Sequence, residues 1–129
     1  MGATVELNSE DFKQTVDREG TVFIDWWAPW CGPCRAFAPI YEDAAAKNTD
    51  ITFAKVNTED HPDLSGLFQI QAIPTLMVFR DGILLFAQAG ALPASALEKL
   101  IGQVRALDMD EVRKELAARE TSNPPASES

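Results

Sequence analysis

Two hydrophobic periodicities alternate along the chain, and each change of period marks the boundary of a predicted element. Continuous runs of apolar and β-branched residues predict buried strands, whereas apolar residues three or four positions apart predict helices. The predicted strands cover 5–7, 22–27, 51–56, 75–79 and 83–87. The predicted helices cover about 9–18, 34–47, a short stretch that begins at 60–62, and about 93–107.

The order of these elements predicts an α/β domain, with a mixed sheet of about five strands and helices on both of its faces. Asp81-Gly82 separates the last two strands, and this dipeptide is a strong signal for a tight hairpin. Pro39 lies inside the predicted helix 34–47 and is expected to kink it. A chain of 129 residues suits one domain whose core needs neither a metal nor a structural disulfide.

The pattern changes after Leu107. Asp108 and Glu111 resemble a capping box, and three apolar residues after Leu107 are spaced to line one side of a short helix: Met109, Val112 and Leu116. We therefore expect a main domain at 1–107 and a short helical extension at 108–120 that packs back on it. Residues 121–129 are small or polar and predict a disordered tail.

The charge of the chain narrows the classes of partner. Eleven Lys and Arg residues oppose twenty Asp and Glu residues, which gives a formal net charge of −9. Nucleic acid and anionic membranes both need a basic surface, so neither is expected as a partner. No apolar run approaches the roughly 20 residues of a membrane span, and the first residues lack the basic start and apolar stretch of a secretory signal. We expect a cytoplasmic protein.

The chain has two cysteines, Cys31 and Cys34, and they lie at the start of the predicted helix 34–47. Side chains three positions apart on a helix are neighbours, with Cβ atoms roughly 5–6 Å apart, which is close to what a disulfide requires. So small a ring would stabilise the fold by only about 2 kcal/mol. In a reducing compartment such a pair is catalytic or binds a metal. A zinc site is the alternative, but only His61 remains to join the two cysteines.

The position of each cysteine predicts its role. Cys31 lies where the unpaired N–H groups and the dipole of a helix favour a thiolate, so we expect it to be the accessible nucleophile. Cys31 would attack the disulfide of another molecule and form a mixed disulfide with it. Cys34, a turn deeper, would then attack this mixed disulfide. Between them, Pro33 limits backbone freedom and Gly32 permits close approach of another chain.

Asp25 is the one carboxylate inside the apolar run 22–27. Burial disfavours a charged carboxylate, so we expect a raised pKa and a group that is partly neutral near pH 7. Such a group can accept the proton of Cys34 through a water molecule and return it later. The alternative is an exposed aspartate at a strand end with no role in catalysis.

The segment from Asp25 to Arg35, which reads Asp-Trp-Trp-Ala-Pro-Trp-Cys-Gly-Pro-Cys-Arg, resembles the active-site segment of the thioredoxin family. Further matching motifs follow in family order, and the resemblance covers about Val5 to Leu107: Lys55, Ile73-Pro74-Thr75, Asp81-Gly82 and Gly90-Ala91. It implies the three-layer α/β/α thioredoxin fold.

The resemblance also implies roles for residues outside the cysteine pair. Lys55 is similar to the family's partner of the buried aspartate. Ile73-Pro74 resembles the family's cis peptide, which faces the cysteines and exposes backbone groups to a substrate strand. Four residues are expected to form a shallow apolar rim around Cys31: Trp30, Ile73, Gly90 and Ala91. The sequence departs from the common pattern at four positions: Trp26, Arg35, Gln69 and Ala72.

These observations predict a protein-disulfide reductase that works by dithiol-disulfide exchange at Cys31 and Cys34. The resemblance implies a monomeric electron carrier of cell redox homeostasis, recharged by a thioredoxin reductase that draws on NADPH. Its redox-active disulfide would then need no cofactor or metal, and its partners would be the reductase and disulfide-containing client proteins. The alternative is a binding or chaperone module of the same fold in which the thiols are secondary.

Overall fold

The computed structural model describes residues 3–122 and contains five strands and five helices in that part of the chain. The strands are β1 (Val5–Glu6), β2 (Thr21–Trp27), β3 (Thr52–Asn57), β4 (Thr75–Arg80) and β5 (Ile83–Ala89). The helices are α1 (Ser9–Asp17), α2 (Gly32–Lys47), α3 (Pro62–Leu67), α4 (Ala94–Ala106) and α5 (Met109–Ser122). Each predicted strand and helix is present, with ends that differ by a few residues.

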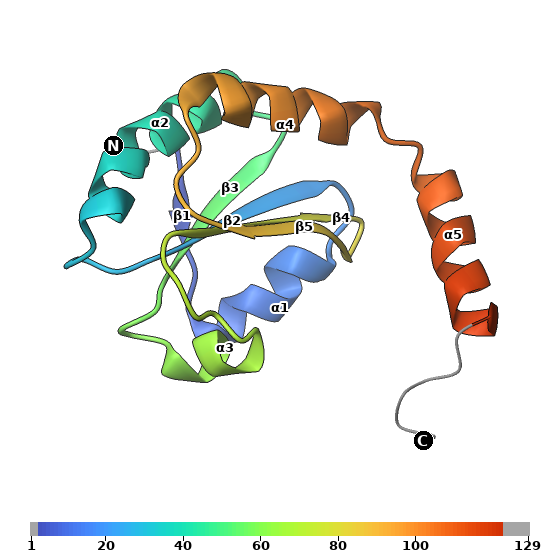
Figure 1. Cartoon of the computed structure of the whole chain (residues 1–129), viewed down its shortest axis with the longest axis horizontal. Helices are drawn as coiled ribbons and strands as arrows, with labels where there is room; N and C mark the ends of the chain where they lie inside the picture. Colours follow the sequence, from blue (N-terminus) through green and yellow to red (C-terminus); the bar gives the residue numbers. More distant parts are fainter. Residues whose placement is uncertain (1–2, 123–129) are drawn as a thin grey trace. The chain divides into compact units, whose positions relative to one another are not determined.

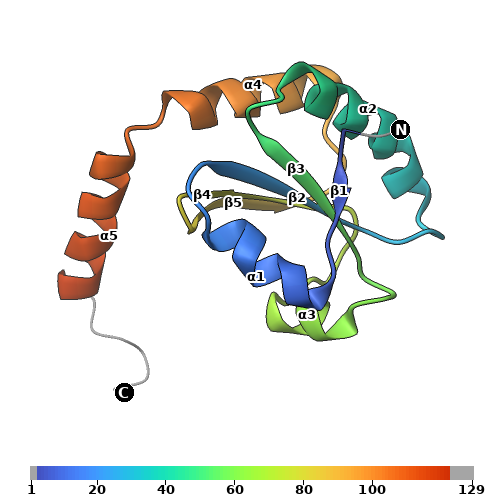
Figure 2. The same cartoon turned by 180° about the vertical axis from the view of Figure 1, so that it is seen from behind.

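The strands form one mixed sheet in the order β1-β3-β2-β4-β5. β3 pairs in parallel with both β1 and β2, whereas β4 runs antiparallel to β2 and β5 antiparallel to β4. Helix α2 lies over one face of this sheet, and α1 and α3 lie over the other (Figures 1 and 2). The predicted α/β architecture with a central mixed sheet is therefore confirmed.

Side chains alternate between the two faces of β2, as the pleat of a strand requires. Ile24 and Trp26 belong to the core cluster that also contains Phe12 of α1 and Leu64 of α3. On the opposite face the Phe23 ring stacks on Phe53 at 5.0 Å between centroids. Asp25 shares this second face, beneath α2.

Helix α2 is joined to that face of the sheet by aromatic packing and one buried hydrogen bond. The Tyr41 ring meets the Phe53 ring edge-on at 5.3 Å, and the Tyr41 hydroxyl donates to the Ala54 carbonyl oxygen at 2.8 Å. Both side chains are buried. These contacts fix the middle of α2, whose N-terminal end carries the cysteines, against β3.

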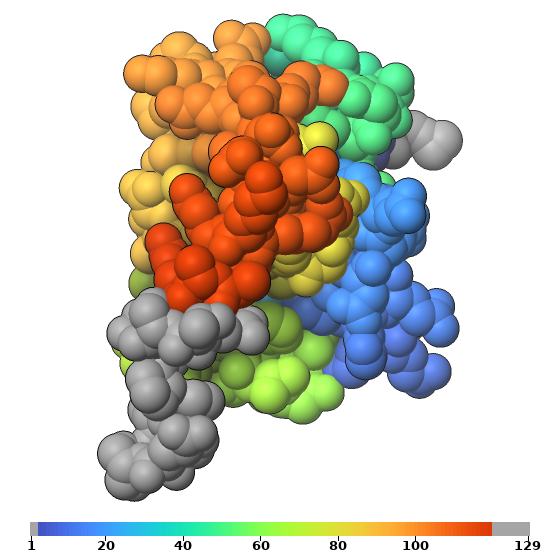
Figure 3. All heavy atoms as spheres, turned by 90° about the vertical axis from the view of Figure 1, so that its right-hand side faces the viewer, coloured from blue at the N-terminus to red at the C-terminus, as the bar shows by residue number. Residues whose placement is uncertain are grey.

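The chain folds into two compact units, Met1–Leu97 and Glu98–Ser129. The first holds the sheet, and the second holds most of α4 and all of α5 (orange to red in Figure 3). In α5 the Asp108 carboxylate accepts the Asp110 backbone N–H at 3.0 Å, as predicted for a cap. Helix α5 extends to Ser122, two residues beyond the expected end of the extension, and the rest of the predicted tail, 123–129, lies outside the described residues.

Among residues 3–122, two residues other than glycine adopt left-handed backbone conformations, Gln69 and Asp81. Asp81 (φ 53°) and Gly82 (φ 81°) form the predicted two-residue hairpin turn, and the Asp81 carboxylate accepts the Gly20 N–H at 2.8 Å. Gln69 (φ 54°) lies in the loop before Pro74, and its side chain is exposed. A side chain in this region costs roughly 1–2 kcal/mol of conformational energy relative to glycine.

Replacing Gln69 by glycine is expected to leave the fold as stable or stabilise it by up to about 1 kcal/mol. Relief of the left-handed conformation offsets the larger entropy of the unfolded chain. Ala72→Gly is the matched control, because Ala72 is also exposed but has no positive φ. It should destabilise by about 0.4–1 kcal/mol. Urea unfolding of both variants tests the difference, and equal losses in the two would contradict it.

Candidate active site

Cys31 and Cys34 form a disulfide with Cα atoms 5.2 Å apart. Both side chains are buried, with exposed fractions of 4% and 3%, and they pack against Ala28, Trp27 and Ile73. The expected exposure of the nucleophile is therefore absent in this oxidised form. The two cysteines differ in their hydrogen bonding and in their position on the helix, and not in their exposure.

Cys31 is the N-cap of α2, which begins at Gly32, two residues earlier than predicted. The sulfur of Cys31 accepts the backbone N–H of Cys34 at 3.2 Å. Pro33 stands within the first turn, where its missing N–H removes no intrahelical bond. A thiolate at this position gains both the unpaired N–H groups and the positive end of the helix dipole.

The strand–helix junction that sets this geometry is held at several points. The Trp27 carbonyl oxygen accepts two hydrogen bonds from Thr58, one from its backbone N–H at 2.8 Å and one from its side-chain hydroxyl at 3.0 Å. The Cys31 N–H donates to the Ala28 carbonyl oxygen at 3.2 Å. Arg35 reaches back from α2 and donates to the Pro29 carbonyl oxygen at 2.9 Å. The cysteine loop is therefore fixed on both sides.

The Ile73–Pro74 peptide is cis, as the resemblance implied. The Ile73 carbonyl oxygen lies 3.7 Å from the sulfur of Cys31, so this loop and the cysteine loop face one another. The Pro74 carbonyl oxygen accepts the N–H of Gly90 at 2.8 Å, which places Gly90 and the adjacent Ala91 beside the same loop.

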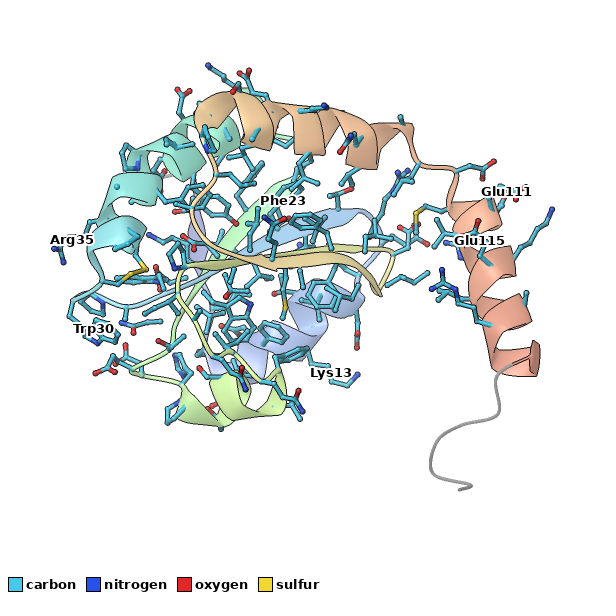
Figure 4. All side chains as sticks on the ribbon, viewed as in Figure 1. Lys13, Phe23, Trp30, Arg35, Glu111 and Glu115 are labelled. Atoms are coloured by element: carbon cyan, nitrogen blue, oxygen red, sulfur yellow. A yellow bond between two sulfur atoms is a disulfide. The ribbon has the colours of Figure 1, made fainter. Side chains whose placement is uncertain are left out.

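A shallow hollow of ≈ 180 Å³ opens beside the cysteines. Trp30 and Ile73, two of the predicted rim residues, line it, and Trp30 is 64% exposed. Figure 4 shows Trp30 and Arg35 projecting from the end of the molecule that carries the yellow disulfide bond. A Cβ added at Gly32 would meet no atom within 4 Å, so the cysteine loop is open on that side.

Asp25 is 1% exposed, and neither of its carboxylate oxygens has a hydrogen-bond partner within residues 3–122. Burial raises the pKa of Asp25 from 3.8 to about 7, the nearby Lys55 ammonium opposes this, and the Glu6 carboxylate adds to it. The expected raised pKa is confirmed, and the alternative of an exposed aspartate is wrong. Asp25 can therefore exchange a proton near neutral pH.

Lys55 stands opposite Asp25 in the register between β3 and β2. Its ammonium nitrogen lies 4.6 Å from the centre of the Trp27 ring, a cation–π distance. Trp27 also packs against the cysteines, so one side chain links Lys55 to the disulfide. Lys55 is half-buried, which strengthens its electrostatic influence on Asp25.

His61, the third candidate zinc ligand, is the N-cap of α3, and its Nδ1 lies 3.4 Å from the Ser9 hydroxyl oxygen. Within residues 3–122 no group of three or more His, Cys, Asp or Glu side chains is placed to hold a metal ion. No helix in this part of the chain is long and apolar enough to cross a bilayer.

The sequence did not identify two features of this site. Glu6 of β1 is paired in register with Lys55 of β3, and this pairing depends on the order of the strands in the sheet. Gln71 and Thr58 line the hollow with Trp30. For Gln71 a local signal exists, because it lies two residues before the predicted cis peptide.

The family model for Thioredoxin matches residues 3–103 of the chain. "Putative thioredoxin 2" of Streptomyces coelicolor is 54% identical over 120 residues, which cover 93% of this chain and 90% of the relative. A thioredoxin of Synechocystis sp. is 38% identical over 107 residues, covering 78% of this chain and 100% of the relative. The solved oxidized form of mitochondrial thioredoxin 3 from Saccharomyces cerevisiae matches with a TM-score of 0.71 and 29% identity, covering 78% of this chain and 95% of that one.

The raised pKa of Asp25 predicts that the oxidised protein loses stability as pH rises from about 4 to 7. Below pH 4 the Asp25 carboxyl is protonated in both the folded and the unfolded state. Above pH 7 it is charged in both states, and the folded state then bears the cost of burying that charge. With the folded pKa at about 7 and the unfolded value at 3.8, the cost reaches about 4 kcal/mol.

Asp25→Asn removes this titration. Its free energy of unfolding, measured in urea at pH 4 to 8, should rise relative to the wild type by about 4 kcal/mol across that range. Glu10→Gln, a change at the exposed start of α1, serves as the control and should show no comparable divergence. A wild-type to Asp25→Asn difference that stays constant with pH would contradict the assignment.

Proposed function

The chain belongs to the thioredoxin family and is a protein thiol-disulfide oxidoreductase, and we propose that Cys31 is its attacking nucleophile, Cys34 its resolving cysteine and Asp25 its proton acceptor. The observation that carries this assignment is the position of the Cys31 sulfur at the N-cap of α2, where it accepts the Cys34 N–H. The thiolate of Cys31 is the form that this position stabilises.

The reaction transfers two electrons from the reduced dithiol to a client disulfide. The Cys31 thiolate attacks one client sulfur, the client S–S bond breaks, and the other client sulfur leaves as a thiolate that takes up a proton. Cys34 then loses its proton and attacks the Cys31 sulfur of the mixed disulfide. The bond to the client breaks, the second client thiol is released, and the Cys31–Cys34 disulfide forms.

Asp25 is proposed to accept the Cys34 proton through a water molecule. Its pKa of about 7 suits a group that must take up and release a proton at neutral pH. Lys55, opposite it in register, stabilises the ionised form and so keeps the carboxyl active as a base. Tyr41 lies close enough for Asp25 to raise its pKa, which places the carboxyl under α2, the helix of the cysteines.

The surface around the cysteines suits an extended segment of a client protein. Trp30 offers an exposed aromatic face, and Ile73 lines the hollow beside it. Gly32 leaves the cysteine loop open to another backbone, and Gly90 and Ala91 complete the rim next to Pro74. A rim that is mostly apolar and main chain favours broad specificity, because it reads little of the client's sequence.

We propose that a thioredoxin reductase using NADPH recharges the disulfide and that the protein works as a monomer in the cytoplasm. On the side of this protein the exchange chemistry uses only the sulfurs of Cys31 and Cys34 and needs no bound cofactor. A formal charge of −9 disfavours nucleic acid and anionic membranes as partners.

The redox domain is proposed to end near Leu107. Relatives named thioredoxin match about 100 residues of this chain and use 92–100% of their own length in doing so. The extension at 108–120 therefore lies beyond what these relatives contain, whereas the alignment with the Streptomyces coelicolor protein is long enough to include part of it.

The roles of the two cysteines are tested by Cys31→Ser and Cys34→Ser, each assayed with NADPH, a bacterial thioredoxin reductase and a disulfide protein. Both variants should lose turnover to the uncatalysed background. Only Cys34→Ser should accumulate a client mixed disulfide on a non-reducing gel, because Cys31 remains able to attack.

Three outcomes would overturn parts of this assignment. Accumulation of the client mixed disulfide in Cys31→Ser would reverse the roles of nucleophile and resolving cysteine. Wild-type activity in Cys31→Ser would favour the binding-module alternative. Turnover with dithiothreitol but not with the reductase would reject the proposed reductase partner while leaving the chemistry intact.

Truncation after Leu107 is expected to leave kcat/KM for a disulfide substrate within about twofold of the full chain, because the proposed site residues all precede that position. The full chain with Met109→Ala is the matched control, since Met109 at the start of α5 is buried. Loss of turnover in the truncated protein, with the control active, would assign the extension a part in catalysis.

A further inference from the structure

Three ionisable residues stand in one row across the sheet. Lys55 of β3 is paired in register with Glu6 of β1 on one side and with Asp25 of β2 on the other. Residues paired in this way project to the same face, and here that face lies under α2. Lys55 therefore stands between two acidic residues, on the three neighbouring strands β1, β3 and β2 that Figure 2 shows side by side.

The two carboxylates differ in their surroundings. Asp25 is buried in the middle of the sheet, whereas Glu6 lies on an edge strand with its residue exposed. Lys55 is held between them with its ammonium over the Trp27 ring. A carboxylate that water can reach is charged at a lower cost than a buried one, so Glu6 can attract Lys55 while Asp25 is protonated.

We propose that Glu6 is a positioning residue, which competes with Asp25 for Lys55 and so sets the pH at which Asp25 takes the proton of Cys34. This inference rests on the proposed function of Asp25. The charge of Glu6 on β1, two strands away from Asp25, would thus set the pH dependence of the resolving step, in which Cys34 attacks the mixed disulfide.

The electrostatics of each carboxylate agree with this arrangement. Burial raises the pKa of Asp25, Lys55 lowers it, and Glu6 raises it again. The Glu6 residue is exposed, but its carboxylate is partly desolvated, which raises its pKa, and the Lys55 ammonium lowers it. Lys55 is thus the favourable charge for both carboxylates, and the Glu6 charge opposes ionisation of Asp25.

Other charged or titratable groups face this row, and none takes the place of Glu6. Asp60 raises and His61 lowers the pKa of Glu6, and both come from the loop before α3. From α2, Tyr41 faces Asp25 but stays neutral, because burial raises its pKa well above 10.0.

The Thr4 hydroxyl lowers the pKa of Glu42 of α2, and the Lys55 ammonium adds to this effect. Its carboxylate is engaged by the Thr4 hydroxyl and by the Ala3 N–H. It is therefore held at the start of β1 rather than over the row. This leaves Glu6 as the carboxylate that shares Lys55 with Asp25 through the strand register.

Glu6→Gln removes the competing charge with little change of shape. Asp25 should then ionise at lower pH, by about 0.3–1 pH unit for two charges separated by two strand spacings. At pH 6 the resolution of a preformed mixed disulfide should accelerate about two- to fivefold, because a larger fraction of Asp25 is ionised. Glu6→Asp keeps the charge and should retain the wild-type midpoint, and Glu10→Gln removes an equal charge from the exposed start of α1.

Two measurements separate this inference from the proposed function. Carbon-13 NMR follows the ionisation of Asp25 in the oxidised protein, and stopped-flow kinetics follow the resolving step from pH 5 to 8. An Asp25 midpoint in Glu6→Gln that is unchanged, or that shifts no more than in Glu10→Gln, would overturn the role of Glu6. If Asp25→Ala keeps the wild-type pH profile of resolution, the proposed role of Asp25 fails, while the NMR midpoint still decides whether Glu6 controls its ionisation.

Discussion

Parallel pairing of β2 with β3 places Asp25 opposite Lys55, and much of the site follows from this register. The same pairing puts Trp27 at the end of β2, where its ring contacts both the Lys55 ammonium and the cysteine cluster. β2 ends there, the chain turns through Ala28, and Cys31 becomes the N-cap of α2. A shift of one residue would turn Asp25 to the other face of the sheet and away from α2.

Burying a carboxyl group under α2 has a cost that the surrounding packing must offset. Asp25 shares its face with the stacked Phe23 and Phe53 rings, and Tyr41 closes the same layer from above. On the opposite face, Phe12 and Trp26 belong to a separate aromatic cluster. Rigid packing on both faces keeps water from solvating the carboxylate freely, which raises the pKa of Asp25. The raised pKa weakens the fold at high pH, and it also makes Asp25 a base at neutral pH.

The elements and the cysteine chemistry were predictable from local sequence, because both depend on neighbours in the chain. The apolar run around Asp25 indicated a buried strand and a raised pKa, and Asp81-Gly82 indicated the hairpin. The role of Glu6 was not predictable, because it depends on β1 pairing with β3, and strand order is set by contacts between residues about fifty positions apart. The left-handed conformation of Gln69 was also missed, since glutamine gives no signal for it.

The asymmetry between the two cysteines must arise from the helix terminus, because burial does not distinguish them. Both are under 5% exposed in the oxidised form. Only Cys31 has a sulfur that accepts a backbone N–H of the first helical turn, and only Cys31 lies against the Ile73 carbonyl oxygen. The N–H favours an anion on that sulfur, whereas the carbonyl oxygen disfavours one and favours a protonated thiol. The N-terminus of α2 is therefore the feature that distinguishes the sulfur of Cys31 from that of Cys34.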